Sequence, residues 1–297
     1  MREQEVCRRL KLKIGIIGAG KVGISIAYVL KQKGINVVAV SDVNETSMHK
    51  AKEYLGEDVF YTFDNAEVIK LSDVIAVTTQ DRIIGDVAVE ISNRMEQLDG
   101  KLFFHTSGAY PASLLKPLEL KKACTGSLHP LQTFPDINSA INVLPDTFIF
   151  IEGSEDSIDI LRRIGNNIGS NVIRIEGQQK LLYHLCAVIV SNLLCSLLYT
   201  GEDIMNKIGI DLSPFFPIIK ATLNNIENKG PIMSLTGPIV RGDIDTVLSH
   251  LKAMEGMDLY KTVYKSLSLV ALKMAKERCD FSEELLDKLG HLLSGNE

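Results

Sequence analysis

Hydrophobic residues in the first 176 positions fall in short runs, separated by stretches in which they recur at helical spacing. Apolar runs bounded by turn residues predict buried strands, and the three-to-four-residue spacing predicts amphipathic helices between them. The predicted strands cover residues 14–17, 37–40, 58–62, 72–79, 101–104, 123–126, 147–152 and 171–176. Because strands and helices alternate, we expect an α/β fold with a Rossmann-type parallel sheet.

The pattern changes at Gln178, where strand-like runs stop and long helical periodicities begin. The predicted helices cover residues 178–208, 214–227, 243–254, 256–278 and 282–293. We therefore expect two domains, a sheet domain at residues 1–176 and an all-α domain at residues 177–297. A cleft between such domains is a preferred ligand site, so we expect the substrate there.

The most apolar stretch, residues 181–199, is barely long enough to span a membrane. It contains His184, Ser191, Asn192 and Ser196, which would be costly to place in hydrocarbon. We therefore predict a buried helix at the centre of the helical domain and no membrane partner.

A glycine-rich turn, Gly18-Ala19-Gly20-Lys21-Val22-Gly23, follows the first strand and opens a helix. In a G-x-G-x-x-G turn the first glycine makes the bend, the second lets the backbone approach a pyrophosphate, and the third lets helix and strand pack closely. The helix N-terminus adds unpaired N–H groups and a positive dipole end. An ordinary glycine-rich turn is the alternative, but the strands on both sides favour a dinucleotide site formed by residues 18–23, including Lys21 and Val22.

Asp42 follows the second strand, close to where a ribose-binding carboxylate is expected. It would repel a 2′-phosphate, and residues 41–47 contain no Lys or Arg, so NAD is favoured over NADP. A turn-capping role for Asp42 is the alternative. Thr78 and Thr79 end another strand at the edge where α/β sheets bind ligands, so each either contacts the cofactor or caps a helix.

The composition excludes several classes of protein. A net charge of −5 without a basic cluster argues against a nucleic-acid partner. The five cysteines are scattered and never in a C-x-x-C arrangement, which indicates reduced thiols in the cytoplasm. Residues 1–13 are charged and lack an apolar core region, so we expect no signal peptide.

Lys180 and His184 are four residues apart and share one face of a predicted helix with Ser191 and nearby Asn192. A polar stripe on an apolar helix is costly unless its groups are satisfied, which favours a ligand-facing role. Lys180 or His184 could act as general acid or base, and Asn192 could orient a substrate. The alternatives are a lysine in solvent and a core histidine.

Three polar residues follow other strands of the sheet domain: His105, Ser107 and His129. A Ser/His hydrolase is disfavoured because no G-x-S-x-G elbow exists. A metal is also disfavoured, since no local ligand spacing such as H-E-x-x-H is present. We expect His105 and His129 to bind the substrate and Ser107 to orient it.

Arg241 lies between two glycine-containing turns, where its guanidinium suits bidentate binding of a carboxylate or phosphate. An ion pair with Asp243 or Asp245 is the alternative. Asp243 is predicted to be the N-cap of the next helix.

Four motifs follow the glycine turn in order: HTSGAYPASLL, GSLHPLQTF, KLLYHLCAVIVSN and LTGPIVRGD. Together they resemble a family of Rossmann-like proteins whose C-terminal part is the domain of unknown function 2520. That family is similar to the 6-phosphogluconate dehydrogenase, hydroxyisobutyrate dehydrogenase and ketopantoate reductase group. The resemblance covers about residues 12–275.

The resemblance implies an NAD(P)-binding domain, a helical domain like the C-terminal domain of 6-phosphogluconate dehydrogenase, and a homodimer. In the hydroxyacid dehydrogenases a G-x-x-K-x-x-x-N motif carries the acid/base lysine. Gly177 and Lys180 match this motif, whereas His184 replaces its asparagine. The implied activity is hydride transfer between nicotinamide and a small, anionic hydroxy acid, keto acid or imine. A non-catalytic NAD(P)-binding sensor is the alternative, and some relatives also bind a deazaflavin.

Overall fold

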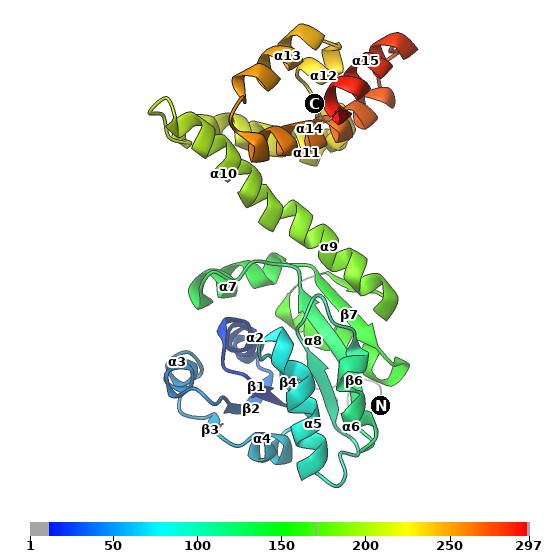
Figure 1. Cartoon of the computed structure of the whole chain (residues 1–297). Helices are drawn as coiled ribbons and strands as arrows, with labels where there is room; N and C mark the ends of the chain where they lie inside the picture. The colour runs from blue at the N-terminus through cyan, green and yellow to red at the C-terminus, as the bar shows by residue number, and fades with distance from the viewer. Residues whose placement is uncertain (1–11, 170, 296–297) are drawn as a thin grey trace. The chain divides into compact units, whose positions relative to one another are not determined.

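The computed structural model describes residues 12–169 and 171–295. Residues 1–11, which include Cys7, lie outside this description. The expectation that residues 1–13 are not a signal peptide therefore falls mostly on residues that are not described. Two compact units make up the chain: a sheet unit that ends at Ser191 and a helical unit that begins at Asn192 (Figure 1). We predicted a boundary at Gly177, where strand-like runs stop.

The sheet unit contains eight strands within the described residues, in the order β3-β2-β1-β4-β5-β6-β7-β8. They are β1 (Lys13–Ile17), β2 (Asn36–Ser41), β3 (Phe60–Thr62), β4 (Val74–Val77), β5 (Leu102–His105), β6 (Cys124–Pro130), β7 (Ile149–Gly153) and β8 (Val172–Arg174). All neighbours pair in parallel except β6 and β7, which are antiparallel. The order of β1 to β6 is that of the Rossmann fold, so the predicted fold class is confirmed.

Helices cover both faces of this sheet, as Figure 1 shows. They are α2 (Lys21–Gln32), α3 (Glu45–Leu55), α4 (Asn65–Leu71), α5 (Ile84–Arg94), α6 (Lys116–Glu119), α7 (Ile137–Val143) and α8 (Glu155–Ile168). Successive residues of one strand enter different cores: Phe104 packs with residues of α2 and α8, and Phe103 packs with residues of α5. Strands buried on both faces require the near-continuous apolar runs seen in the sequence.

The strand predicted at 123–126 is too short. β6 continues to Pro130, so Ser127 and His129 lie within a strand and not in a loop after it. The reason is the antiparallel partner β7, which pairs with β6 from Gly126 to Pro130. A long-range partner of this kind leaves no local signal that a strand continues.

The helical unit confirms the helical periodicities after residue 191. Its helices are α10 (Asn192–Asn206), α11 (Phe216–Ser234), α12 (Pro238–Arg241), α13 (Ile244–Ala253), α14 (Asp258–Lys276) and α15 (Glu283–Ser294). Its core includes Val247, Leu272 and Leu289. Asp243 is the N-cap of α13, as predicted, because its carboxylate accepts a hydrogen bond from Thr246 N.

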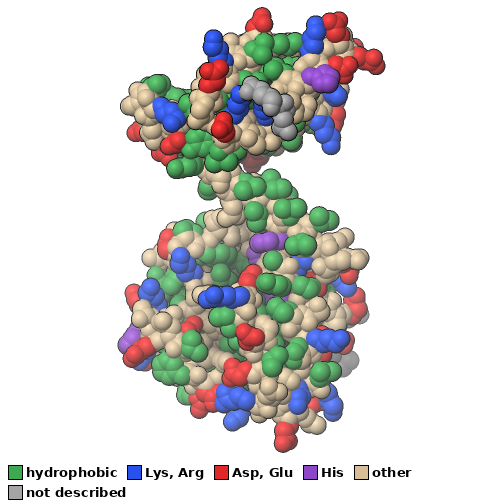
Figure 2. Space-filling model, in the orientation of Figure 1, with side chains coloured by type: hydrophobic (Ala, Val, Ile, Leu, Met, Phe, Trp, Pro, Cys, Tyr) green, Lys and Arg blue, Asp and Glu red, His purple; other side chains and the backbone are tan. Residues whose placement is uncertain are grey.

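The prediction of a buried apolar helix at residues 181–199 is wrong. The segment forms α9 (Lys180–Val190) and α10, separated at Ser191. Its side chains are largely exposed, including Leu182 at 70% and Leu193 at 53%, and Figure 2 shows hydrophobic side chains open on the surface. By length and composition alone, residues 177–206 would suffice to cross a membrane. Hydrophobicity predicted the helix but not which surface covers it.

Candidate functional site

The glycine turn between β1 and α2 is shaped by steric limits at two of its glycines. Gly18 has a φ of +104°, and a Cβ there would lie 2.7 Å from Thr79 N. A Cβ on Gly23 would lie 2.3 Å from Gly18 O and 2.4 Å from Thr78 Oγ1. A Cβ on Gly20 would instead point into open space, with no neighbouring atom within 4 Å. The turn is therefore packed at both ends and open in the middle.

Hydrogen bonds from the residues that directly follow β4 and β2 hold the turn in place. Thr78 Oγ donates to Gly18 O at 2.6 Å, and the Asp42 carboxylate accepts from Ala19 N at 2.7 Å and from Asn44 N at 2.8 Å. Thr78 thus supports the turn and does not cap a helix. The Thr79 hydroxyl is buried and has no hydrogen-bond partner among the described residues.

α2 begins at Lys21 with no side chain capping its first turn. An uncapped helix N-terminus next to an open glycine is suited to bind a phosphate group. The Lys21 ammonium donates to Pro135 O at 2.6 Å, and Val22 packs partly into the core. The residues of this turn therefore fit the pyrophosphate of a dinucleotide.

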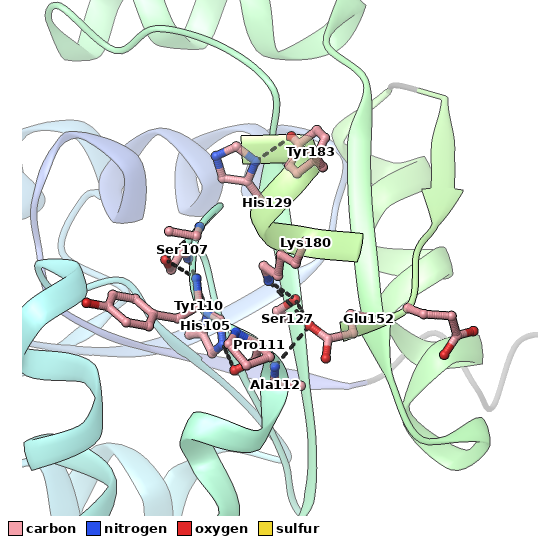
Figure 3. A network of polar contacts seen from close by, with 12 residues as sticks. His105, Ser107, Tyr110, Pro111, Ala112, Ser127, His129, Glu152, Lys180 and Tyr183 are labelled. Carbon is pink, nitrogen blue, oxygen red and sulfur yellow. Dashed lines mark hydrogen bonds and ion pairs between the residues drawn. The ribbon is translucent and has the colours of Figure 1, made fainter. Parts of the chain in front are cut away.

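A second cluster of polar groups lies across β5, β6 and β7. The strand register pairs Ser127 with His105 on one side and with Glu152 on the other. All three side chains are buried, and Ser127 Oγ lies 3.4 Å from Glu152 Oε2 (Figure 3). A carboxylate in this setting requires a positively charged or N–H partner.

Lys180, the first residue of α9, supplies the positive charge. Its side chain is only 2% exposed, which excludes the alternative of a lysine in solvent. Its ammonium donates a hydrogen bond to Ser127 Oγ and lies 3.6 Å from Glu152 Oε2. Burial lowers the pKa of Lys180 to about 8, and the Glu152 carboxylate opposes this shift. Lys180 is therefore a buried cation that can exchange a proton near neutral pH.

His105 and Ser107 are held by the loop that follows β5. The His105 ring bonds Pro111 O through Nε2 at 3.1 Å and accepts from Ser107 N through Nδ1. Burial, together with the Lys180 charge, lowers the pKa of His105 to about 3, so the ring is neutral. Ser107 Oγ donates to Asp81 Oδ2 at 2.6 Å and accepts from two backbone N–H groups. Both side chains shape this loop.

His129 pairs with Tyr183 on α9. Its Nδ1 lies 2.6 Å from the Tyr183 hydroxyl (Figure 3). The Tyr183 ring packs on Phe150 with centroids 4.0 Å apart. Burial and the Lys180 charge lower the pKa of His129 to about 3. A Cβ on Gly108 would lie 2.8 Å from His129 Nε2 and 2.9 Å from His184 Nδ1, so both rings approach this glycine.

The nitrogen of His184 that approaches Gly108, Nδ1, is buried without a hydrogen-bond partner among the described residues. Lys180, Tyr183 and His184 thus share the face of α9 that lies toward β6 and the Gly108 loop. The structure brings together Lys180, His105, His129 and His184 from the residues proposed by sequence.

Two of the proposed residues belong to the helical unit. Asn192 is the first residue of α10, and Arg241 is the last residue of α12. Hydrogen bonds from Thr246 lower the pKa of Asp243, with a smaller effect of the Arg241 charge. Within the described part of the chain, no group of three or more His, Cys, Asp or Glu side chains could hold a metal ion.

Sequence reasoning missed Ser127, Glu152 and Tyr183 as members of the cluster. Glu152 lies in an apolar strand and Ser127 in a stretch predicted to be a loop, and no motif joins them. Tyr183 could have been found, because it lies three residues after Lys180 and so shares its helix face.

The strand order and the glycine turn define a Rossmann-like domain. A family model of the Rossmann-like domain matches residues 2–130, and a model of the domain of unknown function DUF2520 matches residues 147–270. The chain therefore combines a Rossmann-like domain with a DUF2520 domain. No protein of curated function matches the sequence.

Solved structures support the same fold. A protein from Thermotoga maritima is 23% identical with a TM-score of 0.70, and the match covers 89% of this chain and 98% of that one. A candidate NADP oxidoreductase from Bacteroides fragilis gives the same four values. An imine reductase from Streptomyces aurantiacus is 14% identical with a TM-score of 0.61, covering 94% and 93% of the two chains. At these identities the likeness establishes the fold.

Substitution distinguishes the tightly packed Gly23 from the open Gly20. Gly23→Ala should lower the free energy of unfolding by about 1–3 kcal/mol, because its Cβ collides with backbone and with Thr78. Gly20→Ala should cost less than about 1 kcal/mol, since it points into open space. It should still weaken dinucleotide binding about tenfold, which corresponds to about 1.4 kcal/mol. Urea unfolding and calorimetry with NADH measure the two effects, and equal stability losses would contradict this account of the turn.

Proposed function

We propose that the protein is an NAD(P)-dependent oxidoreductase that reduces, or in reverse oxidises, a small molecule at the carboxyl edge of its sheet. The observation that carries this proposal is the pairing of an open, uncapped glycine turn with a buried lysine in the same sheet unit. The names of its structural relatives, which include an NADP oxidoreductase and an imine reductase, support the same class.

The dinucleotide would be held by the backbone of residues 18–23, with Asp42 near its ribose and Thr78 and Thr79 beside the turn. NAD is favoured because the Asp42 carboxylate would repel a 2′-phosphate. Ser41 and Asn44 are already engaged, Ser41 with Asn65 and Asn44 as the N-cap of α3. The cofactor would supply or accept the hydride.

The remaining step is a proton transfer, which we assign to Lys180. In reduction, the substrate carbon gains a hydride and loses its double bond to oxygen or nitrogen. The oxygen or nitrogen then takes a proton from the Lys180 ammonium, which becomes a neutral amine. In oxidation the neutral amine takes the proton back. A group with a pKa of about 8 is suited to either direction near neutral pH.

The substrate class is a small, anionic hydroxy acid, keto acid or imine. His184 has a buried ring nitrogen with no hydrogen-bond partner in residues 12–169 and 171–295, which makes it a second candidate for substrate contact or for acid/base work. His105 and His129 are neutral, so they would act as hydrogen-bonding groups. Ser107 would act by shaping the loop after β5. Asn192 and Arg241 are kept, from the sequence, as candidates for orienting the substrate and binding its anion.

The exposed apolar side chains of α9 and α10 favour a homodimer. Lys180 and His184 occupy the inward face of α9, whereas Leu181, Leu182 and Leu185 are exposed. Exposed apolar patches of this kind mark interaction sites. A second copy of the chain fits them better than lipid does, because Ser191 and Asn192 interrupt the stretch. The free thiols of Cys124, Cys186, Cys195 and Cys279 support a cytoplasmic location.

The hydrogen bond and ion pair that already occupy Lys180 favour a second candidate function, a non-catalytic NAD(P)-binding sensor. In that case Lys180 would only neutralise Glu152.

Substitution of Lys180 distinguishes the enzyme from the sensor. With NADH and NADPH and a panel of small keto acids and cyclic imines, Lys180→Arg should lower kcat by about 10²–10⁴-fold, because a guanidinium does not release its proton. Reduction by the wild type should decline above about pH 8 as the ammonium is lost, and oxidation should rise through the same pH.

The matched control is Lys101→Arg. Lys101 is also partly buried with a lowered pKa, but it donates to Ser72 O, remote from the cluster. It should leave kcat and the pH profile unchanged. Tight NADH binding without turnover of any substrate, in wild type and Lys180→Arg alike, would favour the sensor.

The cofactor preference depends on one charge. Asp42→Asn keeps an acceptor for Ala19 N but removes the repulsion of a 2′-phosphate. It should raise the affinity for NADPH relative to NADH about tenfold, or about 1.4 kcal/mol. Calorimetry with both cofactors measures the ratio, and the same ratio in wild type and variant would show that Asp42 does not select the cofactor.

The oligomeric state tests the apolar surface of α10. Light scattering after gel filtration should give the mass of two chains for the wild type. The double variant Leu193→Glu, Leu197→Glu should give the mass of one chain, because each charge would be buried in the interface. Val89→Lys is the control, since Val89 is 48% exposed on α5. Dimers of the double variant would place the interface elsewhere.

A further inference from the structure

Glu152 in β7 is a buried carboxylate that the proposed reaction does not use directly. The residue is 9% exposed. Its Oε2 accepts a hydrogen bond from Ala112 N at 3.0 Å and from Ser127 Oγ at 3.4 Å, and lies 3.6 Å from Lys180 Nζ (Figure 3). A buried charge is retained only where such partners compensate its loss of solvation.

The chain makes room for this carboxylate just before Lys180. A Cβ on Gly177 would lie 2.6 Å from Glu152 Oε1, so any larger residue would displace the carboxylate. Gly177 begins a short 3₁₀ helix that leads directly into α9. The three-residue spacing of Gly177 and Lys180 thus lets one turn of helix pass over Glu152 and place the ammonium beside it.

We propose that Glu152 is a positioning residue that keeps Lys180 protonated and directed at the reacting edge, with Ser127 as the second acceptor for its ammonium. This inference rests on the proposed function, in which Lys180 gives the proton. It assigns Glu152 a role that acts through Lys180 and not through contact with substrate.

Four charged or titratable groups from separate elements face Lys180. Two are His105 on β5 and His129 on β6, whose pKa values are lowered by burial and then by the Lys180 charge, so both are neutral. The third, Asp81, also raises the pKa of Lys180, but it accepts the hydroxyl hydrogen of Ser107. Only Glu152 both faces the ammonium and pairs with it. Its charge is therefore the main influence opposing the burial of Lys180.

The consequence concerns the direction of the reaction. Burial alone favours the neutral amine, which is a base and cannot donate a proton. With Glu152 beside it, Lys180 stays an ammonium at pH 7 and can protonate the oxygen or nitrogen of a reduced carbonyl or imine. The pair therefore adapts the site to reduction of a C=O or C=N bond.

The experiment follows the titration of Lys180 itself by NMR, in the full chain labelled with ¹³C-lysine and without substrate. The signal that disappears in Lys180→Arg identifies the residue. In Glu152→Gln, which keeps the shape and the acceptor oxygen, Lys180 should titrate at least about one pH unit lower than in wild type. Glu152→Asp restores the charge and should recover part of the shift. Ser127→Ala should also lower the pH at which Lys180 titrates, because its ammonium loses a hydrogen-bond acceptor.

Kinetics provide the second readout. In Glu152→Gln, kcat for reduction at pH 7.5 should fall about threefold, because a pKa about one unit lower leaves about a third as much ammonium at this pH. The decline at high pH should begin about one unit lower, while KM for NADH stays unchanged. Glu119→Gln is the matched control: this carboxylate accepts a hydrogen bond from Thr125 on β6, the strand that also carries Ser127, but does not pair with Lys180. It should leave the titration unchanged.

Two results would overturn the proposal: a Lys180 titration that is the same in wild type and Glu152→Gln, or a lower kcat with an unmoved pH profile. If the titration shifts as expected but no variant or wild type reduces any substrate, the positioning role stands and the proposed oxidoreductase function fails.

Discussion

The register of β5, β6 and β7 is the constraint on which the candidate site depends. It places His105, Ser127 and Glu152 side by side, one from each strand. β7 runs antiparallel to β6, and this pairing sets Glu152 opposite Ser127. A carboxylate buried at this point needs a cation, and α9 begins where Lys180 can supply it. The pairing of β6 with β7 thus determines where the buried carboxylate lies and where α9 must begin to place Lys180 beside it.

The cofactor end of the unit depends on a second constraint, the close packing of the glycine turn between two strands. Gly23 contacts Gly18 O and Thr78 so closely that no side chain fits, and Asp42 holds Ala19 N from the other side. These contacts leave Gly20 and the start of α2 open. The two ends therefore differ in kind: the glycine turn is held by close packing, and the cluster around Lys180 is held by paired charges.

Features with local causes could be predicted from the sequence. The glycine turn, the apolar strands and the Asp243 cap each depend on a few neighbouring residues, and the structure has them where the pattern indicated. The full length of β6 and the burial of Glu152 beside Lys180 could not be predicted, because both depend on partners 19 or more residues away. The apolar stretch at 181–199 shows a different limit. Its composition predicts an apolar helix, but these residues do not indicate which surface would bury it.

α9 shows both limits, because it makes a long-range contact to Glu152 and also carries an exposed apolar surface. Its polar residues Lys180, Tyr183 and His184 face the sheet, and its leucines face outward, which reverses the usual arrangement of a surface helix. On the inward face, Lys180 is paired with Ser127 and Glu152 and Tyr183 with His129, which offsets the cost of burying these two polar side chains. The outward face gains free energy only if another apolar surface covers it. One helix therefore carries both the buried lysine and an exposed apolar surface.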